Sequence, residues 1–357
     1  MKTCRGAKNL LENCGEARAG ERLLIAYEPP EFGYYDADAL MCVRETALAM
    51  DLQVEALNVG FSPDKPELTP ELIRAFDQAD IILFLARLGD QLRFSDMPKG
   101  KRIIVSFALD AWLFSSGFGT THHMAMMRLK TQIGATLAQA KHVRVTCERG
   151  SDFSGRPIMP GEGTGDTSIR RFPMSVFQPV PAATFSGRVA LCGFLTGTGS
   201  LYYDDYTLEF DGPVHALMKD GRLTGFEGSA GDVAAANAHY DRVSEMFGID
   251  RNFVHSWHAG MHPGCGYTRS ARDNYERWGG SSFGNPRILH FHTCGTYAPG
   301  EISWNMLDPT IEIDGVKVWE SGVFHAELLP GGQEVLDTYP CAKWAFENPV
   351  REIGMAV

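Results

Sequence analysis

Short apolar runs alternate with helically spaced runs through the first 150 residues. Asp38 is a plausible cap for a helix that ends near Asp51, and Thr69-Pro70-Glu71 combines a cap residue, a proline and an acid, as helix starts do. A longer amphipathic run covers about 121–140. The apolar runs typical of buried strands are 22–28, 52–59, 79–86, 101–108 and 142–148. Strands separated by helices predict a parallel sheet with helices on both faces.

The pattern changes after residue 150. Residues 150–166 are rich in glycine, proline and aspartate, which is typical of a loop or linker. Beyond them, alternating runs are broken by Asp-Gly pairs, which are strong hairpin signals. The pairs are at 211–212, 220–221 and 314–315. One helix is expected in this half, capped by Asp232 and ended by Gly248.

Two domains follow from this change of pattern. We predict an α/β N-terminal domain, with a parallel sheet and helices, in residues 1–150. A linker is expected at 151–171, and a β-rich α+β domain that carries the metal and substrate site at 172–357. A chain of 357 residues is long enough for two domains of ordinary size.

Composition narrows the classes of partner. Hydrophobic residues make up 44% of the chain and charged residues 22%, which is typical of a globular protein with an ample core. The net charge of -11 argues against nucleic acid or an anionic membrane as a partner, because both need basic patches. No apolar run approaches the length of a membrane span, and the first twenty residues lack an apolar signal core. A cytoplasmic location is therefore the expectation.

Motifs for nucleotides and disulfides are absent. No GxGxxG follows a strand run and no P-loop is present, so nucleotide binding has no support. The eight cysteines are scattered without a CxxC pair, which favours free thiols. Cys265 and Cys294 lie close to a group of histidines, so a thiolate ligand or nucleophile is one interpretation, and a small buried thiol is the ordinary one.

The histidines gather in one stretch, between Phe253 and Asp308. It holds five of the eleven, namely His255, His258, His262, His290 and His292. They occupy two short β-type runs, each of which leads into glycine and proline. Neutral imidazole is the commonest protein ligand for zinc, iron and copper, so two strands that bring imidazoles together predict a metal site. Any single histidine has the alternative of an ordinary place in the core or on the surface.

Strand periodicity pairs two of these histidines. Residues two apart in a strand share a face, so His290 and His292 point to the same side. With His258 they would hold one divalent metal and leave a coordination position open. Glu301 is a candidate fourth ligand or general base, or else an exposed loop carboxylate. Glu301, His255 and His262 are the candidates for catalytic roles, and a metal-free pocket in which the histidines act as acid and base is the alternative.

Aromatic residues near the histidines predict an apolar wall. Trp257, Tyr267 and Trp304 are the candidates for contact with a flat substrate, and a place in the core is the alternative for each. Weaker site candidates lie elsewhere in the chain. They are the carboxylates after the first strand, the histidine pair before the long helix and an acidic pair in the second half: Glu28, Glu31, His122, His123, Asp204 and Asp205.

Four motifs carry a family resemblance. They are GSDFSG at 150–155, the hairpin block at 206–228, HAGMHPG at 258–264, and ISWNML at 302–307 followed by EIDG. In order and spacing they resemble the thermophilic metalloaminopeptidase family of aminopeptidases T and S, nearest its 2,5-dihydroxypyridine 5,6-dioxygenase-like branch. The likeness runs from about residue 150 to 325, and the length of the chain is closer to the dioxygenase branch.

The chain departs from that family at its metal ligands. The family's His-x-Asp pair falls on Ser303 and Asn305, and its first ligand falls on Ser256 or, with a slip of one residue, on His255. A further family histidine falls on His290. The resemblance therefore implies a retained pocket with a metal site rebuilt around other residues.

The resemblance also implies a function. We expect a metal-dependent enzyme acting on a small aromatic or N-heterocyclic compound, in the form of a ring-cleaving dioxygenase, with iron as the metal and zinc or manganese as alternatives. A metal-dependent aminopeptidase-like or amide hydrolase is a second interpretation, and a non-catalytic relative that binds a small molecule is a third. Members of the family are dimers, so a homodimer is expected.

Overall fold

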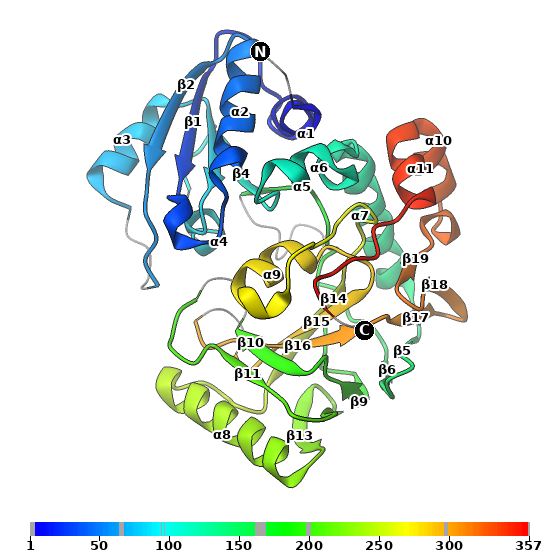
Figure 1. The fold of residues 1–357 in the computed structure, drawn as a ribbon. Coiled ribbons are helices and arrows are strands. Elements are labelled where there is room, and N and C mark those ends of the chain that lie inside the picture. The colour runs from blue at the N-terminus through cyan, green and yellow to red at the C-terminus, as the bar shows by residue number, and fades with distance from the viewer. Residues whose placement is uncertain are drawn as a thin grey trace.

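Three β-sheets organise the chain. The computed structural model describes residues 4–63, 68–93, 95, 97–160, 169–197, 201–295 and 299–355. A parallel sheet forms one part of the molecule, and two antiparallel sheets form the other, with α9 (Tyr275–Ser282) between them (Figure 1). An α/β part joined to a β-rich part is the fold class that the sequence predicts. No helix in the described ranges is both long and apolar enough to cross a membrane.

The parallel sheet has five strands. In spatial order they are β2 (Gln53–Asn58), β1 (Arg22–Tyr27), β3 (Ile81–Leu85), β4 (Arg102–Ser106) and β7 (Arg170–Phe172). β3 is buried along its whole length, as its unbroken apolar run predicts for a central parallel strand. Separate hydrophobic clusters pack on the two faces, so helices and loops cover the sheet on both sides.

Helices of the first part start at capping side chains. Thr69 accepts a hydrogen bond from the Leu72 amide, as the Thr-Pro-Glu pattern predicts. Asp38 was expected to be a cap, but the cap position is Asp36, and Asp38 lies in the first turn, where it accepts from the Ala111 amide. The α-helices of this part are α1 (Arg5–Asn9), α2 (Ala37–Ala49), α3 (Pro70–Gln78), α4 (Leu88–Gln91), α5 (Ala111–Ser115) and α6 (Gly117–Thr120). A π-helical turn (Leu10–Cys14) and a 3-10 turn (Pro30–Phe32) complete it.

The first antiparallel sheet has six strands. In spatial order they are β11 (Thr207–Glu209), β10 (Phe194–Gly197), β16 (Ile302–Leu307), β15 (Ile288–Thr293), β14 (Val254–Ala259) and β8 (Val180–Pro181). β14, β15 and β16 are central and almost entirely buried. These three strands contain the histidine stretch and the ISWNML motif.

The second antiparallel sheet has eight strands and packs against the first. Phe153 of this sheet lies with its ring 5.8 Å from Trp257 and 5.2 Å from Phe291 of the six-stranded sheet, so aromatic side chains fill the space between the sheets. In spatial order the strands are β13 (Arg222–Glu227), β12 (His215–Lys219), β9 (Ser186–Ala190), β6 (Asp152–Gly155), β5 (Val143–Thr146), β17 (Thr310–Ile313), β18 (Val316–Glu320) and β19 (Val323–Phe324).

Two of the three Asp-Gly pairs form hairpins. At 220–221 and 314–315 both residues have positive φ, which a two-residue turn of this type requires, and the flanking strands pair. The pair at 211–212 does not form a hairpin, because β11 and β12 on either side belong to different sheets. The Asp211 and Gly212 amides instead donate to the carboxylate of Asp232.

The predicted cap of helix α8 is also wrong, because Asp232 binds these two amides. Ser229, not Asp232, caps helix α8 (Ala230–Phe247), and Gly248 ends it with φ 63°, as predicted. The long predicted helix is α7 (His123–Gln139), whose apolar residues share one hydrophobic core with the eight-stranded sheet. The remaining helices are α10 (Gly332–Thr338) and α11 (Pro340–Glu347), with 3-10 turns at Ala271–Asp273 and Ala326–Leu328.

Near residue 150 the chain passes between the sheets more than once. The predicted strand at 142–148 forms as β5, but it joins the eight-stranded antiparallel sheet and not the parallel one. The expected linker contains β6, and it also contains β7, which returns to the parallel sheet. Both strands are too short, and too rich in glycine and arginine, to give an apolar alternation. The division into domains at residues 150 and 172 stays a prediction.

Candidate metal centre

Three histidines meet on two neighbouring strands. His258 lies in β14, and His290 and His292 lie in β15. The antiparallel register places His258 opposite His290. One ring nitrogen from each histidine lies within 4.8 Å of those of the other two, and no further histidine, cysteine or carboxylate in the described residues belongs to this group. The three histidines predicted as ligands are therefore brought together and could hold a metal ion.

The alternation of side chains along β16 places two polar residues beside the histidines. His290 is opposite Asn305 and His292 is opposite Ser303 on β16, so these side chains share the face of the histidines. The Ser303 hydroxyl donates to Asn305 Oδ1 over 3.0 Å. The two positions at which the resembled family has ligands thus carry neutral groups that bond to each other.

Outer hydrogen bonds hold two of the imidazole rings. The backbone carbonyl of Phe177 lies 2.8 Å from His258 Nδ1, and Glu301 Oε1 lies 2.8 Å from His292 Nδ1. A carbonyl and a carboxylate can only accept, so each Nδ1 carries a proton, and in a neutral ring Nε2 then carries the lone pair. A histidine that donates its outer N–H to a carbonyl or carboxylate is the usual arrangement of a metal ligand.

The two Nε2 atoms face each other over 3.2 Å. Two lone pairs at that distance repel, and neither neutral ring has a proton to share in this tautomer. Two nitrogens bound to one cation at bond lengths of about 2.0–2.1 Å lie roughly 2.9 to 3.4 Å apart for bond angles between a right angle and the tetrahedral angle. The separation of the two rings therefore fits a cation bound to both.

Three buried polar atoms around the histidines lack a hydrogen-bond partner within the described ranges. They are His290 Nδ1, Glu301 Oε2 and Asn305 Nδ2. Buried polar groups are normally satisfied, so three together indicate that a ligand or ordered solvent belongs there. The His290 ring is held by packing, because the Phe283 ring stacks on it at 4.0 Å between centroids and 19° between planes.

Burial favours the neutral form of His258 and His290. Desolvation is the main cause that lowers the pKa of His258 well below its usual range, and the charge of His292 adds to it. Desolvation also lowers the pKa of His290, followed by the charges of His258 and His292. Only the neutral imidazole can coordinate a metal, so the environment favours the form that binds.

Glu301 lies behind the ring of His292, not among the three nitrogens. Its carboxylate contacts the outer Nδ1, and its side chain is only 3% exposed. The alternative of an exposed loop carboxylate is therefore wrong. In this position Glu301 orients the ring and raises the basicity of Nε2. Its predicted role as ligand or general base stays a prediction.

The other two histidines of the stretch lie outside the group of three. His255 is half-buried and has Nδ1 2.8 Å from the Ser256 hydroxyl. His262 is fully buried past the end of β14, packs edge-on against Phe118, and accepts from the Gly264 amide. Burial lowers the pKa of His262 to about 3, so it is neutral. Acid–base roles for both remain untested predictions.

The predicted aromatic wall is not on the face of the histidines. Trp257 is adjacent to His258 in the strand and so points to the opposite side, and Trp304 shares that side. Both are fully buried in the core between the antiparallel sheets. Tyr267 packs in a different small cluster with Trp278 and Ile353. Phe283, which the sequence did not single out, lies against the site instead.

The weaker candidates have local structural partners. His122 caps α7 by accepting from the Met124 amide, and the His123 backbone amide donates to Asn9. The backbone carbonyls of Asp204 and Asp205 accept from Arg242, and Glu31 is exposed. Cys265 and Cys294, for which a thiolate role was one interpretation, are buried thiols, and burial raises the pKa of each. None of these residues joins the three histidines.

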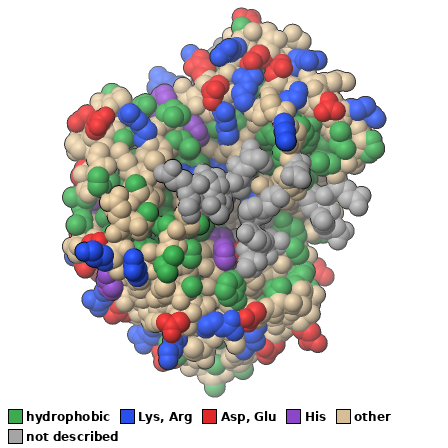
Figure 2. Space-filling view, turned by 180° about the vertical axis from the view of Figure 1, so that it is seen from behind, with side chains coloured by type: hydrophobic (Ala, Val, Ile, Leu, Met, Phe, Trp, Pro, Cys, Tyr) green, Lys and Arg blue, Asp and Glu red, His purple; other side chains and the backbone are tan. Residues whose placement is uncertain are grey.

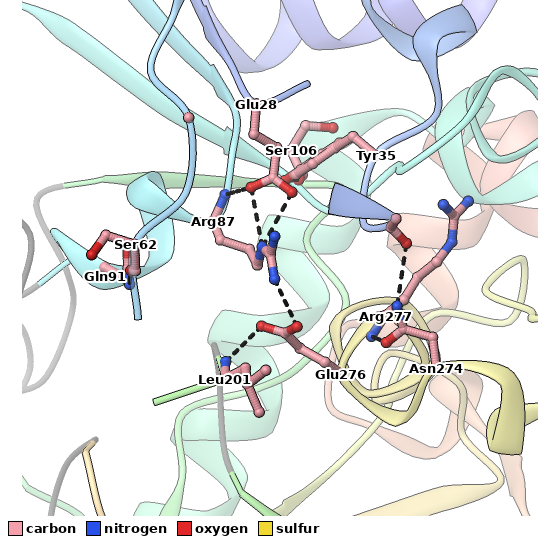
Figure 3. A network of polar contacts seen from close by, with 12 residues as sticks. Glu28, Tyr35, Ser62, Arg87, Gln91, Ser106, Leu201, Asn274, Glu276 and Arg277 are labelled. Atoms are coloured by element: carbon pink, nitrogen blue, oxygen red, sulfur yellow. Dashed lines mark hydrogen bonds and ion pairs between the residues drawn. The ribbon is translucent and has the colours of Figure 1, made fainter. Parts of the chain in front are cut away.

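A second polar network links the two parts of the molecule and was not foreseen. Arg87 donates to Glu28, which follows β1, and to Glu276 Oε2 on α9, over 2.7 Å (Figure 3). Glu276 Oε1 in turn accepts from the Leu201 amide. Glu28 and Arg87 lie at the carboxyl ends of β1 and β3, the edge at which open α/β sheets place ligands. That edge therefore faces the half that carries the histidines.

Comparisons with known proteins show a shared fold. No protein-family model matches the chain, and no curated protein matches it. Among solved structures, the chain is similar to a 2,5-dihydroxypyridine dioxygenase from Pseudomonas putida KT2440, with a TM-score of 0.59 and 15% sequence identity. The similarity covers 93% of this chain and 99% of that chain. The wider resemblance to aminopeptidases T and S, and the expected homodimer, stay predictions.

Proposed function

We propose that the protein is a metal-dependent enzyme in which His258, His290 and His292 bind one divalent metal ion. The observation that carries this is the pair of Nε2 atoms 3.2 Å apart, each with its Nδ1 proton committed to an outer acceptor. Three neutral nitrogens suit a single cation, because two close cations would repel without carboxylates between them.

The favoured reaction is oxygen-dependent cleavage of a small aromatic or N-heterocyclic ring. Three points support it. The donor set suits iron(II), the site lies on a buried face beside the flat Phe283 ring, and the solved structure of similar fold is named as a dihydroxypyridine dioxygenase. Iron bound there would supply the one-electron and O2 chemistry that protein side chains lack.

The side chains have separate tasks in this proposal. The Phe177 carbonyl and the Glu301 carboxylate hold the proton on the outer nitrogen of His258 and His292, so both rings present lone pairs inward. Phe283 fixes the plane of His290 and offers an apolar surface to a flat ring. The buried sheet limits the access of bulk water, which strengthens every electrostatic interaction in the site.

Metal analysis and oxygen uptake test the proposal together. The full chain is purified, loaded anaerobically with iron(II), zinc or manganese in separate samples, and assayed for bound metal and for O2 consumption with a panel of dihydroxylated pyridines and benzenes. We expect about one iron per chain and O2 uptake with at least one ring compound. One zinc per chain, with peptide or amide cleavage and no O2 uptake, would establish the hydrolase interpretation instead. No bound metal would contradict both.

A further inference from the structure

Two of the eight cysteines lie side by side in the first part of the molecule. Cys4 immediately precedes α1, and Cys42 lies in the middle of α2. These two helices pack against each other, as Figure 1 shows near the N-terminus. Both cysteine side chains are half-buried and pack against the same hydrophobic cluster, so neither is sealed from solvent.

One threonine hydroxyl joins the backbones of the two cysteines. The Cys4 amide donates to Thr46 Oγ1 over 3.1 Å, and this hydroxyl in turn donates to the Cys42 carbonyl over 2.8 Å. Thr46 lies one helical turn after Cys42 and on the same face of α2. The bridge therefore holds Cys4 against the turn of α2 that carries Cys42.

The two thiols interact and ionise in a fixed order. The Cys42 thiol hydrogen-bonds to the sulfur of Cys4, and this is the main cause that lowers the pKa of Cys4 to about 6, with the first amides of α1 adding to it against desolvation. The same bond raises the pKa of Cys42, followed by desolvation and by the charges of Cys4, Asp38 and Glu45. The pair therefore loses one proton readily, from Cys4, and Cys42 remains a thiol.

The surroundings of the first part do not stabilise a thiolate by themselves. Figure 2 shows Lys and Arg side chains mixed with Asp and Glu over the parallel-sheet part of the face that it displays, so neither sign of charge dominates there. The Cys4 thiolate is stabilised by its immediate neighbours, the Cys42 thiol and the backbone amides of α1. A thiolate beside a thiol is the usual arrangement of a redox-active pair.

Most of the other cysteines are protected. Cys14, Cys192, Cys265 and Cys294 are buried, and desolvation raises the pKa of each, so these four remain inert thiols. Cys341 is exposed on α11 and accepts from the His122 amide. It serves as a reference for the reactivity of an exposed thiol.

We propose that Cys4 and Cys42 form a peroxide-sensitive site, in which hydrogen peroxide converts the two thiols into a disulfide that links α1 to α2. The Cys4 thiolate attacks one peroxide oxygen, so that an S–O bond forms, the O–O bond breaks, and the departing hydroxide takes up a proton to leave as water. The Cys42 sulfur then attacks the sulfur of the Cys4 sulfenic acid. The S–S bond forms as the S–O bond breaks, and the hydroxide leaves with the Cys42 proton as a second water.

This inference is independent of the three-histidine centre. Two thiols lose two electrons in total, and one peroxide is reduced to two water molecules, so no metal takes part. The disulfide closes the segment of chain that contains β1 and fixes the start of the chain to α2. A thiol reductant reverses the change.

Peroxide treatment of the full chain tests the proposal. The protein is reduced, freed from reductant and kept with a chelator, so that no bound iron reacts with peroxide. It is then treated with hydrogen peroxide and mapped by mass spectrometry of non-reduced peptides. We expect the free thiols to fall from eight to about six, with a peptide pair linked through Cys4 and Cys42 that dithiothreitol separates.

Three variants separate the two steps. Cys42→Ser should stop the reaction at the Cys4 sulfenic acid, which dimedone traps, and should slow alkylation of Cys4 by iodoacetamide at about pH 7 roughly tenfold, because the partner thiol is gone. Cys4→Ser should leave Cys42 as a free thiol, because its raised pKa keeps it protonated. Cys341→Ser is the control and should form the wild-type cross-link.

Three results would overturn the proposal. In the first, Cys341 is oxidised while Cys4 and Cys42 keep their thiols. In the second, the disulfide joins two chains and appears as a dimer on a non-reducing denaturing gel. In the third, wild-type Cys4 passes to sulfinic acid without a linked peptide, which would mean that Cys42 does not reach it.

Discussion

Two buried polar networks lie near the contact between the parallel sheet and the antiparallel sheets, and they differ in how completely they are satisfied. Arg87 bonds to Glu28 and Glu276, and its guanidinium also packs 3.4 Å above the centroid of the Phe61 ring. The network of His258, His290, His292 and Glu301 leaves His290 Nδ1 and Glu301 Oε2 without partners in the described chain and sets two lone pairs against each other.

The difference separates a structural role from a binding role. Buried charges that are fully paired hold elements in place and have no capacity left for a ligand. Buried polar atoms that are not satisfied are costly, and they persist where a ligand completes them. The first network therefore connects α9 to the edge of the parallel sheet, and the second has the properties of a binding site. The predictions below test this distinction from the largest expected effect to the smallest.

Removal of one histidine should abolish the site. His290→Ala should lower bound metal from about one equivalent to below about 0.1 and eliminate turnover, because two imidazoles cannot hold the ion against solvent. The His215→Ala variant is the control, since His215 lies in β12 and bonds to the Arg149 carbonyl, away from the three histidines. Elemental analysis and O2 uptake measure both variants. Full metal content in His290→Ala would mean that the three histidines do not form the site.

Removal of the central arginine of the satisfied network should destabilise the fold and not the metal site. Arg87→Met leaves Glu28 and Glu276 as unpaired buried carboxylates, and breaking a buried pair in this way costs about 3–5 kcal/mol. Urea unfolding measures the loss. The triple variant that adds Glu28→Gln and Glu276→Gln should recover part of it, because the unpaired charges are gone. A loss of metal content with unchanged stability would reverse the assignment of the two networks.

Removal of the outer carboxylate should weaken the metal site without eliminating it. Glu301→Gln keeps the shape of the side chain but no longer accepts from His292 as a carboxylate, and outer partners of this kind are worth about 10- to 100-fold in metal affinity. Competition with a chelator of known affinity measures the change. An effect as large as that of His290→Ala would identify Glu301 as a direct ligand.

Removal of the Ser303 hydroxyl beside the histidines should have the smallest effect on stability and metal binding. Ser303→Ala removes one neutral hydrogen bond to Asn305, which is worth about 1 kcal/mol, and leaves the three histidines unchanged. Thermal unfolding should show a small decrease in Tm with wild-type metal content. A large loss of metal would show that Ser303, at a position where the resembled family has a ligand, takes part in binding.

Local sequence patterns determined much of this protein. The apolar runs predicted β1, β2, β3 and β4 of the parallel sheet, and helical spacing predicted α2, α3, α7 and α8, because burial and helix formation act over a few residues. The period of two in a strand placed His290 and His292 on one face, and two Asp-Gly pairs adopted the turns that their positive φ allows. Two of the three histidines that could hold a metal were found in this way, and His258 was chosen because it precedes the glycine turn that carries a ligand in the resembled family.

Only the tertiary structure determined which groups surround the three histidines. Strand period fixes the side on which a residue lies but not which strand is its neighbour, so the register of His258 opposite His290 needed the assembled sheet. The same period should have excluded Trp257 from the site once His258 was chosen. The Phe177 carbonyl and the position of Glu301 behind His292 come from segments with no apolar pattern, and tertiary contacts place them beside the histidines. No local preference encodes such contacts, because their free energy comes from the burial of the whole core.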